Sequence, residues 1–487
     1  MNEEMFANYL GPKAENIEML KNLVNKVLDH QAHWRQSFYS NDKSLYENVP
    51  AQNSRLEIEL EAFLKRSDKS FPYFHPRYAA QMVKDPSFPT ILGYLAFMLS
   101  NPNNHAYEGG PVTTEMEMEA VELMLKFTGL NEGWGHLCSG GSLANMEALW
   151  AARDFYSEGK VCFSEVSHYS WKRICKILGI KNYKEMPVDQ FFRMDINSLE
   201  EELKKNKVMF VMANLGSTGA GSVDNLEELL LLREKYNFHL HVDAAYGGFV
   251  KSVILNDDYT LMPFNSERMH LSAYTYKQLS LLGEADSITI DPHKHGLISY
   301  GAGAVLYKNE ELRSVLLNTA PYTYHKQDKP NIGMFSLEGS RPGAMAAACY
   351  LTYKVMPPVS SSIGSLISQS LAASKKLHDM IEQSPTLANL NYPDLDINCF
   401  YRQSPEKDVA KLNEQTLEIY HRLSVETENP EFIISKFVIP PHIARTALPG
   451  YSNMNGENLT ALRTVFMKHW PALNDFYYVK ELMRVLE

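Results

Sequence analysis

Cysteine is scarce in this sequence of 487 residues. The five thiols are scattered along the chain, at Cys138, Cys162, Cys175, Cys349 and Cys399. No Cys-x-x-Cys pair occurs, so neither a disulfide framework nor a cysteine zinc site is indicated. An odd number of dispersed cysteines is typical of a reducing compartment, and we therefore expect a cytoplasmic protein.

Basic residues and long apolar runs are lacking as well. Lysine and arginine number 47 against 58 acidic residues, which gives a formal net charge of −11. There is no polybasic run, and because the phosphate backbone rewards clustered cations, nucleic acid is not an expected partner. No apolar run approaches the roughly 18 residues that a membrane span needs. Residues 1–16 lack the basic and apolar regions of a signal peptide.

The composition that is present, 45% apolar and 22% charged, is ordinary for a soluble globular protein. Apolar residues recur at helical spacing near the start of the chain, and the pattern after about residue 360 mixes helices with short strands. We expect a helical arm at 1–75, a large α/β domain at 76–356 and a small α+β domain at 357–487.

Apolar segments in the middle of the chain predict strands at 161–163, 208–213, 239–242, 287–290 and 304–307. Helical patterns lie between several of these segments, for example at 171–178 and 226–236. This alternation predicts a mostly parallel sheet with right-handed crossovers. In such sheets ligands bind outside the carboxyl ends of the strands.

The most informative stretch is residues 287–303, which reads SITIDPHKHGLISYGAG. Lys294 follows its strand, and a lysine in this place can pack its stem on apolar surface while its amine reaches into a cleft. Residues 239–248, HLHVDAAYGG, have the same design, with a strand that ends in Asp243. Our hypothesis is that Lys294 and Asp243 hold opposite sides of one cofactor.

An aldehyde cofactor needs a lysine, because a primary amine gives a reversible Schiff base. A pyridinium ring needs an anion against its nitrogen, and Asp243 can supply it through a charge-assisted hydrogen bond. His168 could stack on one face of such a ring, and Ala245 could fill the other. These residue types are the parts of a pyridoxal 5′-phosphate (PLP) site, in which the protein orients and tunes the cofactor.

The phosphate of such a cofactor needs amides and hydroxyls. Gly141 and Ser142 lie in a small-residue turn before a predicted helix, where free amides favour an anion. Thr218 could hydrogen-bond the ring oxygen or a substrate carboxylate. Taken singly, each of these residues more often has a structural role, and the joint case rests on their order and their shared position after strands.

A metal site is the competing interpretation. His239 and His241 point to the same face of a predicted strand, and Asp291, His293 and His295 could add ligands. No His-Glu-x-x-His motif exists, however, and Asp243 would face opposite neighbours. We therefore expect no metal.

The sequence resembles the group II PLP-dependent amino-acid decarboxylases of fold type I, nearest to the bacterial L-tyrosine decarboxylase branch. The matching segments are residues 10–16, 33–36, 133–136, 141–145, 168–171, 241–248 and 287–296. The resemblance implies an aspartate-aminotransferase-like fold: a mostly parallel sheet with flanking helices, an N-terminal helical arm and a smaller C-terminal α+β domain. It implies the loss of the α-carboxylate of an L-amino acid as CO₂, with release of the amine.

The resemblance also implies roles for individual residues. Lys294 would bond to PLP, Asp243 would pair with the ring nitrogen, and His168 would stack on the ring. His293 would lie beside the cofactor. Ser340 would reach the phosphate of the cofactor bound in a neighbouring subunit, because these enzymes are homodimers with active sites at the interface.

A tyrosine would return the proton to the substrate's α-carbon. Tyr300 stands where the tyrosine branch places such a residue, and the broader family uses a tyrosine on a loop, for which Tyr322 or Tyr324 is the candidate. The resemblance therefore leaves two positions for the proton donor.

The substrate side chain is the less defined part. Tyrosine or a related aromatic acid such as DOPA is the favoured substrate, and a wall of aromatic residues is compatible with it: Tyr73, Phe74, Tyr78 and Tyr107. Where tyrosine-specific enzymes carry a histidine near the substrate ring, this chain has Gln81. An acidic substrate, aspartate or glutamate, is the alternative, because Arg77 or His105 could pair with its carboxylate. There are three further alternatives for the function: another PLP lyase, a transaminase, or a binding protein that has lost activity. We expect Gln81, His105 and Tyr107 to contact the substrate.

Overall fold

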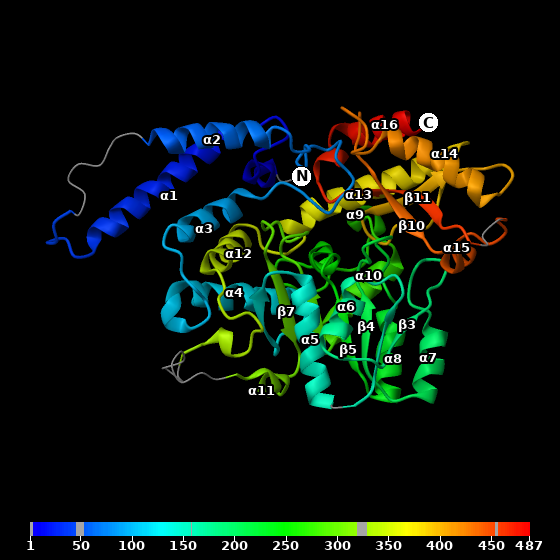
Figure 1. The fold of residues 1–487 in the computed structure, drawn as a ribbon, viewed down its shortest axis with the longest axis horizontal. Coiled ribbons are helices and arrows are strands. Elements are labelled where there is room, and N and C mark those ends of the chain that lie inside the picture. The colour runs from blue at the N-terminus through cyan, green and yellow to red at the C-terminus, as the bar shows by residue number, and fades with distance from the viewer. Residues whose placement is uncertain (1–2, 45–52, 157, 319–328, 453–455) are drawn as a thin grey trace.

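The computed structural model describes residues 3–44, 53–156, 158–318, 329–452 and 456–487. It is an α/β protein with one seven-stranded sheet and one four-stranded sheet. Figure 1 shows the large sheet with its helices at one end of the molecule and the small sheet beside the C-terminus. No helix of the described residues is both long and apolar enough to cross a membrane.

The large sheet has the strand order β1-β7-β6-β5-β4-β2-β3. The strands are β1 (Trp134–Cys138), β2 (Lys160–Ser164), β3 (Tyr183–Met186), β4 (Val208–Asn214), β5 (His239–Asp243), β6 (Ser287–Ile290) and β7 (Gly303–Tyr307). The five strands from β3 to β6 run parallel. Only β7 runs against its neighbours β1 and β6. The predicted mostly parallel sheet is thus confirmed, and the carboxyl ends of β1 and of the five parallel strands share one edge.

Burial explains why the central strands are apolar. All residues of β4, β5, β6 and β7 are buried, as expected for a sheet covered by helices on both faces. The edge strand β3 reads Tyr-Lys-Glu-Met and was not predicted, because an exposed edge does not need an apolar run.

The helices of this part are α3 (Phe88–Met98), α4 (Pro111–Thr128), α5 (Gly141–Tyr156), α6 (Ser170–Ile177), α7 (Ile196–Lys205), α8 (Leu226–Tyr236), α9 (Ser266–Met269), α10 (Ala273–Ser280), α11 (Leu312–Leu316) and α12 (Gly343–Val355). Helix α8 begins and ends where the sequence predicts. The Asn225 side chain accepts a hydrogen bond from the backbone N–H of Glu228, and Asn237 adopts the left-handed conformation at the other end.

The small sheet is antiparallel, with the order β10-β11-β9-β8. Its strands are β8 (Leu387–Asn389), β9 (Ile397–Arg402), β10 (Ser435–Ile439) and β11 (Leu459–Val465), and its helices are α13 (Ile363–Glu382), α14 (Val409–Arg422), α15 (Pro441–Ala447) and α16 (Leu473–Leu486). A separate apolar cluster, which includes Phe400, Leu462 and Leu482, lies between this sheet and its helices.

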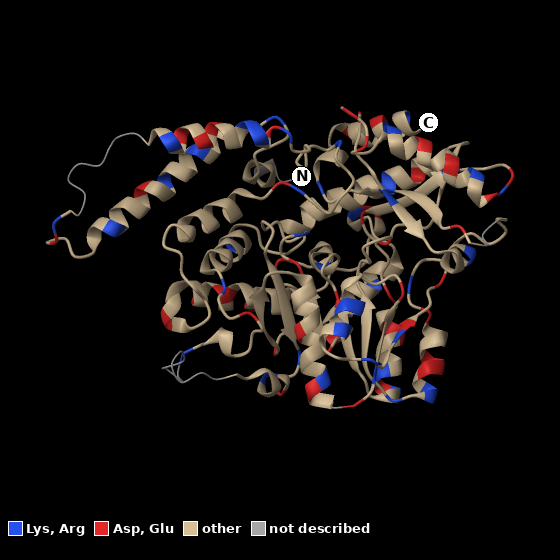
Figure 2. Cartoon of the chain, viewed as in Figure 1, with Lys and Arg blue, Asp and Glu red and all other residues tan. Residues whose placement is uncertain are grey.

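The N-terminal helices α1 (Ile17–Ser37) and α2 (Ser54–Ser67) contain no buried residue. They extend beyond the rest of the molecule, with charged residues of both signs along their length (Figures 1 and 2). Two hydrogen bonds tie α1 to α3: Gln31 Nε2 donates to the Ala96 carbonyl, and Arg35 Nη2 donates to the Leu99 carbonyl. The preceding residues are anchored differently, because Tyr9 is fully buried against His469.

Candidate active site

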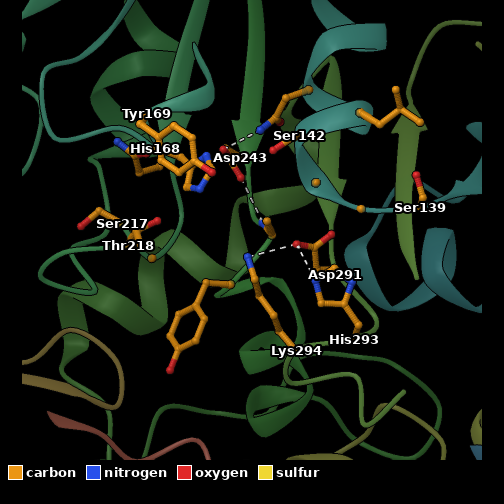
Figure 3. Close-up of a pocket in the computed structure, with 18 residues that line it drawn as sticks. Ser139, Ser142, His168, Tyr169, Ser217, Thr218, Asp243, Asp291, His293 and Lys294 are labelled. Carbon is orange, nitrogen blue, oxygen red and sulfur yellow. Dashed lines mark hydrogen bonds and ion pairs between the residues drawn. The ribbon is translucent and has the colours of Figure 1, made fainter. Parts of the chain in front are cut away.

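A cavity of about 430 Å³ opens at the carboxyl edge of the large sheet. Its walls are the segments that follow β1, β2, β4, β5 and β6, the position that strand–helix alternation predicts. Eight residues expected at a cofactor line it: Gly141, Ser142, His168, Thr218, Asp243, Ala245, His293 and Lys294. Figure 3 shows the side chains of Asp243, His168 and Lys294 directed into the same space from three different segments.

Lys294 lies in the turn after β6, which is closed by a hydrogen bond from its backbone N–H to the carbonyl of Asp291. Its Nζ lies 3.0 Å from Asp291 Oδ2, and His293 Nε2 lies 3.4 Å from the same oxygen. Asp291 is buried, and its Oδ1 has no hydrogen-bond partner among the described residues. A partly exposed amine is therefore held at the cavity wall by a buried carboxylate.

Asp243 ends β5 and is held by three donors. Asn145 Nδ2 donates to its Oδ2 over 2.7 Å, and Trp171 Nε1 donates to the same oxygen over 3.2 Å. The backbone N–H of Ala245 donates to Oδ1 over 3.3 Å. The carboxylate is buried and fixed in orientation. An anion that pairs with a ring nitrogen needs such a fixed orientation.

A buried chain of hydrogen bonds runs behind this carboxylate. His239 Nε2 and His241 Nδ1 each lie 2.7 Å from Ser287 Oγ, and His241 Nε2 lies 3.0 Å from Asn145 Oδ1. A hydroxyl has one proton, and Asn145 already points its amide nitrogen at Asp243. His241 Nε2 therefore donates to Asn145, Ser287 donates to His241 Nδ1, and His239 donates to Ser287.

Burial favours the neutral form of both histidines in this hydrogen-bonded network, His239 and His241. Burial lowers the pKa of His239 to about 4 and holds the pKa of His241 well below its usual range. The two residues weighed as metal ligands thus make hydrogen bonds that fix Asp243. The described residues contain no group of three or more side chains arranged to bind a metal.

His168 follows β2, and its Nδ1 lies 2.7 Å from Ser170 Oγ. Burial lowers the pKa of His168, against the opposing effect of Asp243, and Lys294 lowers it further. A neutral imidazole at the cavity wall suits stacking on a flat, positively charged ring.

The start of α5 forms the third wall. A helix start leaves backbone N–H groups without intrahelical acceptors, and these attract anions. A Cβ added at Gly141 would lie 2.9 Å from Asp291 Oδ2, and one added at Gly303 would lie 2.5 Å from the Cα of Gly140. The close packing therefore requires glycine here, and both Gly141 and Ser142 line the cavity. A lysine, a fixed carboxylate and this anion cradle together fit PLP.

Several expected residues lie in the described part of the chain but outside the cavity wall, and the aromatic residues Tyr73, Phe74 and Tyr78 are among them. Ser340 is exposed, and its Oγ accepts a hydrogen bond from Asn103 Nδ2. The carbonyl of His105 accepts from the backbone N–H of Gly333. Tyr107 donates to Glu115 Oε1 over 2.8 Å, and Gln81 is exposed. Their expected contacts with a cofactor or substrate stay predictions.

Tyr300 contacts a cavity residue but does not itself line the cavity. Its ring centroid is 4.6 Å from that of His293, and its hydroxyl donates to the carbonyl of Met82 over 2.7 Å. Its side chain is more than half exposed. Tyr322 and Tyr324 lie outside the described residues.

Several cavity residues were not expected from the sequence: Ser139, Asn145, Asn214, Ser217, Tyr246 and Asp291. Asn145 could have been found, because it stands one helical turn after Gly141 and so shares its face. Asp291 directly follows β6 and was interpreted only as the end of that strand or as a metal ligand.

Comparison with known proteins agrees with this site. The family model described as the pyridoxal-dependent decarboxylase conserved domain matches residues 70–386. An L-tyrosine decarboxylase from Enterococcus faecium is 28% identical, over 99% of this chain and 98% of its own length. An L-tyrosine decarboxylase from Levilactobacillus brevis is also 28% identical, over 78% of this chain and 75% of its own. A probable L-aspartate decarboxylase from Archaeoglobus fulgidus is 30% identical, over 59% of this chain and 71% of its own.

Solved structures share the fold. Mouse CSAD superposes with a TM-score of 0.72 at 20% identity, covering 96% of this chain and 98% of its own. Oryza sativa TDC, crystallised with PLP and tryptamine, gives the same TM-score at 15% identity over the same shares of the two chains. The expected PLP fold type I is thus confirmed, and the chain belongs to the pyridoxal-dependent decarboxylase family, as a PLP-dependent amino-acid decarboxylase.

Proposed function

We propose that the protein converts L-tyrosine, or a related aromatic L-amino acid, to its amine and CO₂. The observation that carries the reaction is the meeting of Lys294, Asp243 and His168 at one cavity. The aromatic substrate is supported by the tyrosine decarboxylase of Enterococcus faecium, which aligns over nearly the whole chain.

The residues of the cavity have different roles in this reaction. When bound, PLP supplies an electron sink for the charge left behind as CO₂ departs. Lys294 would hold the cofactor through its aldehyde, because a primary amine can form a reversible bond with an aldehyde. Asp243, fixed by Asn145 and Trp171, keeps a proton on the ring nitrogen.

Other groups orient the ring. His168 and Ala245 hold its two faces, and His293 lies beside it. The amides and hydroxyl of Gly141 and Ser142 bind the phosphate. Thr218 bonds the ring oxygen or the substrate carboxylate. Each of these residues lines the cavity.

The proton for the α-carbon comes from Tyr300 or from the loop residue Tyr322. In favour of Tyr300 is its contact with the ring of His293, which lines the cavity. Its hydroxyl must then leave the carbonyl of Met82 and turn toward the substrate.

An acidic substrate is the second candidate, because the aspartate decarboxylase relative is 30% identical. Arg77, the cation considered as a partner for the side-chain carboxylate of such a substrate, has other partners. Arg77 Nη1 donates to the carbonyl of Glu431, and its guanidinium lies 4.7 Å from the Phe432 ring centre. The aromatic substrate is favoured because the tyrosine decarboxylase relative aligns over 99% of this chain and the aspartate decarboxylase relative over 59%.

We further propose that the enzyme is a homodimer of cytoplasmic location, built from an arm (1–75), a large domain (76–356) and a small domain (357–487). The exposed apolar side chains of α1 and α2, among them Trp34, Ile58 and Phe63, need a cover, and a second copy of the chain would provide it. Ser340 then reaches the phosphate of the partner's cofactor, and Gln81, His105 and Tyr107 contact the substrate. The five cysteines are free and buried, which suits a reducing compartment.

A panel of the twenty amino acids, with CO₂ and amine measured after addition of PLP, tests the proposed function. We expect release from tyrosine and related aromatic acids. Release from aspartate or glutamate alone would establish the second candidate. A keto acid in place of an amine would indicate transamination.

A further inference from the structure

Asp396 connects two cavity segments that are distant in sequence. The Tyr246 hydroxyl donates to Asp396 Oδ1 over 2.6 Å, and His295 Nε2 lies 3.2 Å from Asp396 Oδ2. Tyr246 lines the cavity in the segment after Asp243, and His295 directly follows Lys294. We call these three side chains, Tyr246, His295 and Asp396, the Asp396 bridge.

The bridge is sealed from solvent. His295 and Asp396 are fully buried, and Tyr246 is 2% exposed. Burial alone would raise the pKa of Asp396, but His295 and the Tyr246 hydroxyl together hold that pKa below its usual range. An ionised carboxylate in such a place depends on its partners: the Tyr246 hydroxyl donates a hydrogen bond to it, and the His295 ring lies within ion-pair distance of it.

The backbone around Asp396 is fixed as well. Its carbonyl accepts a hydrogen bond from the backbone N–H of Phe466, just beyond β11. The neighbouring Leu395 packs so closely on the large domain that a Cβ added at Gly216 would lie 2.8 Å from its Cδ1. The rings of Tyr246 and His295 also contact each other, with centroids 4.9 Å apart. These contacts therefore restrict the position of the Asp396 carboxylate.

We propose that Asp396 is a positioning residue that sets the spacing between Asp243 and Lys294 and so orients the cofactor ring. This inference rests on the cofactor placement of the proposed function. It assigns to the segment that precedes β9 a task in the active site, although Asp396 itself does not line the cavity.

The test compares Asp396→Asn with Asp394→Asn in the full-length protein. Asp394 is a matched control, because it is a buried carboxylate of the same segment. Its partners are Arg193 Nη2, at 2.6 Å, and the backbone N–H of Val223, at 3.0 Å. Neither of these residues lines the cavity.

Three quantities separate positioning from general stability: the melting temperature of the apoprotein, the dissociation constant of PLP, and the induced circular dichroism of bound PLP. We expect both variants to melt earlier than the wild type. Only Asp396→Asn should weaken PLP binding, by about tenfold or more, and change the circular dichroism at saturating PLP. It should also lower kcat more than it alters KM.

Equal effects of the two variants on the cofactor would overturn the positioning role of Asp396 while leaving the proposed function intact. A wild-type protein that does not bind PLP would overturn both. If an aspartate variant does not fold, Tyr246→Phe replaces it, with Tyr274→Phe as control, because the Tyr274 hydroxyl donates to the Val223 carbonyl. An unchanged circular dichroism in Tyr246→Phe then contradicts the bridge.

Discussion

Asn145 joins Asp243 to the buried histidine pair: its amide nitrogen donates to the carboxylate over 2.7 Å, while its amide oxygen lies 3.0 Å from His241 Nε2. One side chain of α5 thereby fixes both the orientation of the carboxylate and the tautomer of His241. The anion of the cofactor site is thus held from the interior of the sheet and not from solvent.

Asn145→Ala should weaken the site and the fold together. The change leaves Asp243 Oδ2 with only Trp171 as donor, and a buried charged group that loses a hydrogen bond costs about 1–3 kcal/mol. We expect a loss of that size in the free energy of unfolding, measured in urea, and weaker PLP binding in a fluorescence titration. Asn256→Ala, at an exposed asparagine, should change neither. Unaltered PLP affinity in Asn145→Ala would argue against the role of Asp243.

Lys294→Ala should abolish covalent attachment of PLP. Reduction of the wild-type enzyme with borohydride should leave the cofactor on the peptide that contains residue 294, as read by mass spectrometry. Lys308→Ala is the control, because Lys308 is an exposed lysine that pairs with Glu284. Labelling of the Lys294→Ala protein at another lysine to the wild-type extent would show that the assignment is wrong.

Acid should destabilise the protein through its buried histidines. In the unfolded chain His239 takes up a proton below its ordinary pKa of 6.5, whereas in the fold burial lowers this pKa to about 4. The unfolded state therefore binds more protons between these values, so stability is complete above 6.5 and falls as the pH decreases toward 4. This residue alone accounts for about 3 kcal/mol.

His239→Gln should flatten the dependence of unfolding free energy on pH, because glutamine keeps a donor for Ser287 but does not titrate. Urea unfolding of the apoprotein between about pH 7 and pH 5 measures the slope. His421→Gln, at an exposed histidine paired with Glu426, should retain the wild-type slope. A slope that is the same in all three proteins would mean that His239 is protonated in the fold.

The exposed apolar face of α2 should be needed for dimer formation. Ile58 and Phe63 are 65% and 64% exposed in the single chain. Ile58→Asp places a charge where we expect a second copy, so sedimentation should show dissociation to monomers with an unchanged far-ultraviolet circular dichroism spectrum. Glu59→Asp, on the same helix, is the control. A dimer that persists in Ile58→Asp would place the interface elsewhere.

The sequence predicted those parts of the fold that local chemistry determines. Strand β6 and helix α8 have the predicted bounds, because a short alternating strand and a capped helix carry their own signals. Helix α4 begins at Pro111, since proline is accepted in the first turn of a helix. The antiparallel direction of β7 could not be predicted, because strand direction depends on how the chain returns and not on strand composition.

The same distinction holds for the cavity. Lys294, Asp243 and His168 follow strands and were expected to meet at one edge of the sheet. Asn145 and Tyr246 were not, because a helical asparagine and a tyrosine after a strand have many ordinary uses. Asp396 lies about 150 residues from Tyr246 and about 100 from His295 in the sequence, so only tertiary packing brings them into contact.

Strand β7 has a consequence for the protein as it is being made. Within the large sheet β1 is hydrogen-bonded only to β7, and β7 joins it to β6. A chain that ended before residue 303 would contain every strand from β1 to β6 but would lack the strand that pairs β1 with the rest of the sheet. Such a fragment would expose the edges of β1 and β6, and unpaired strand edges favour aggregation.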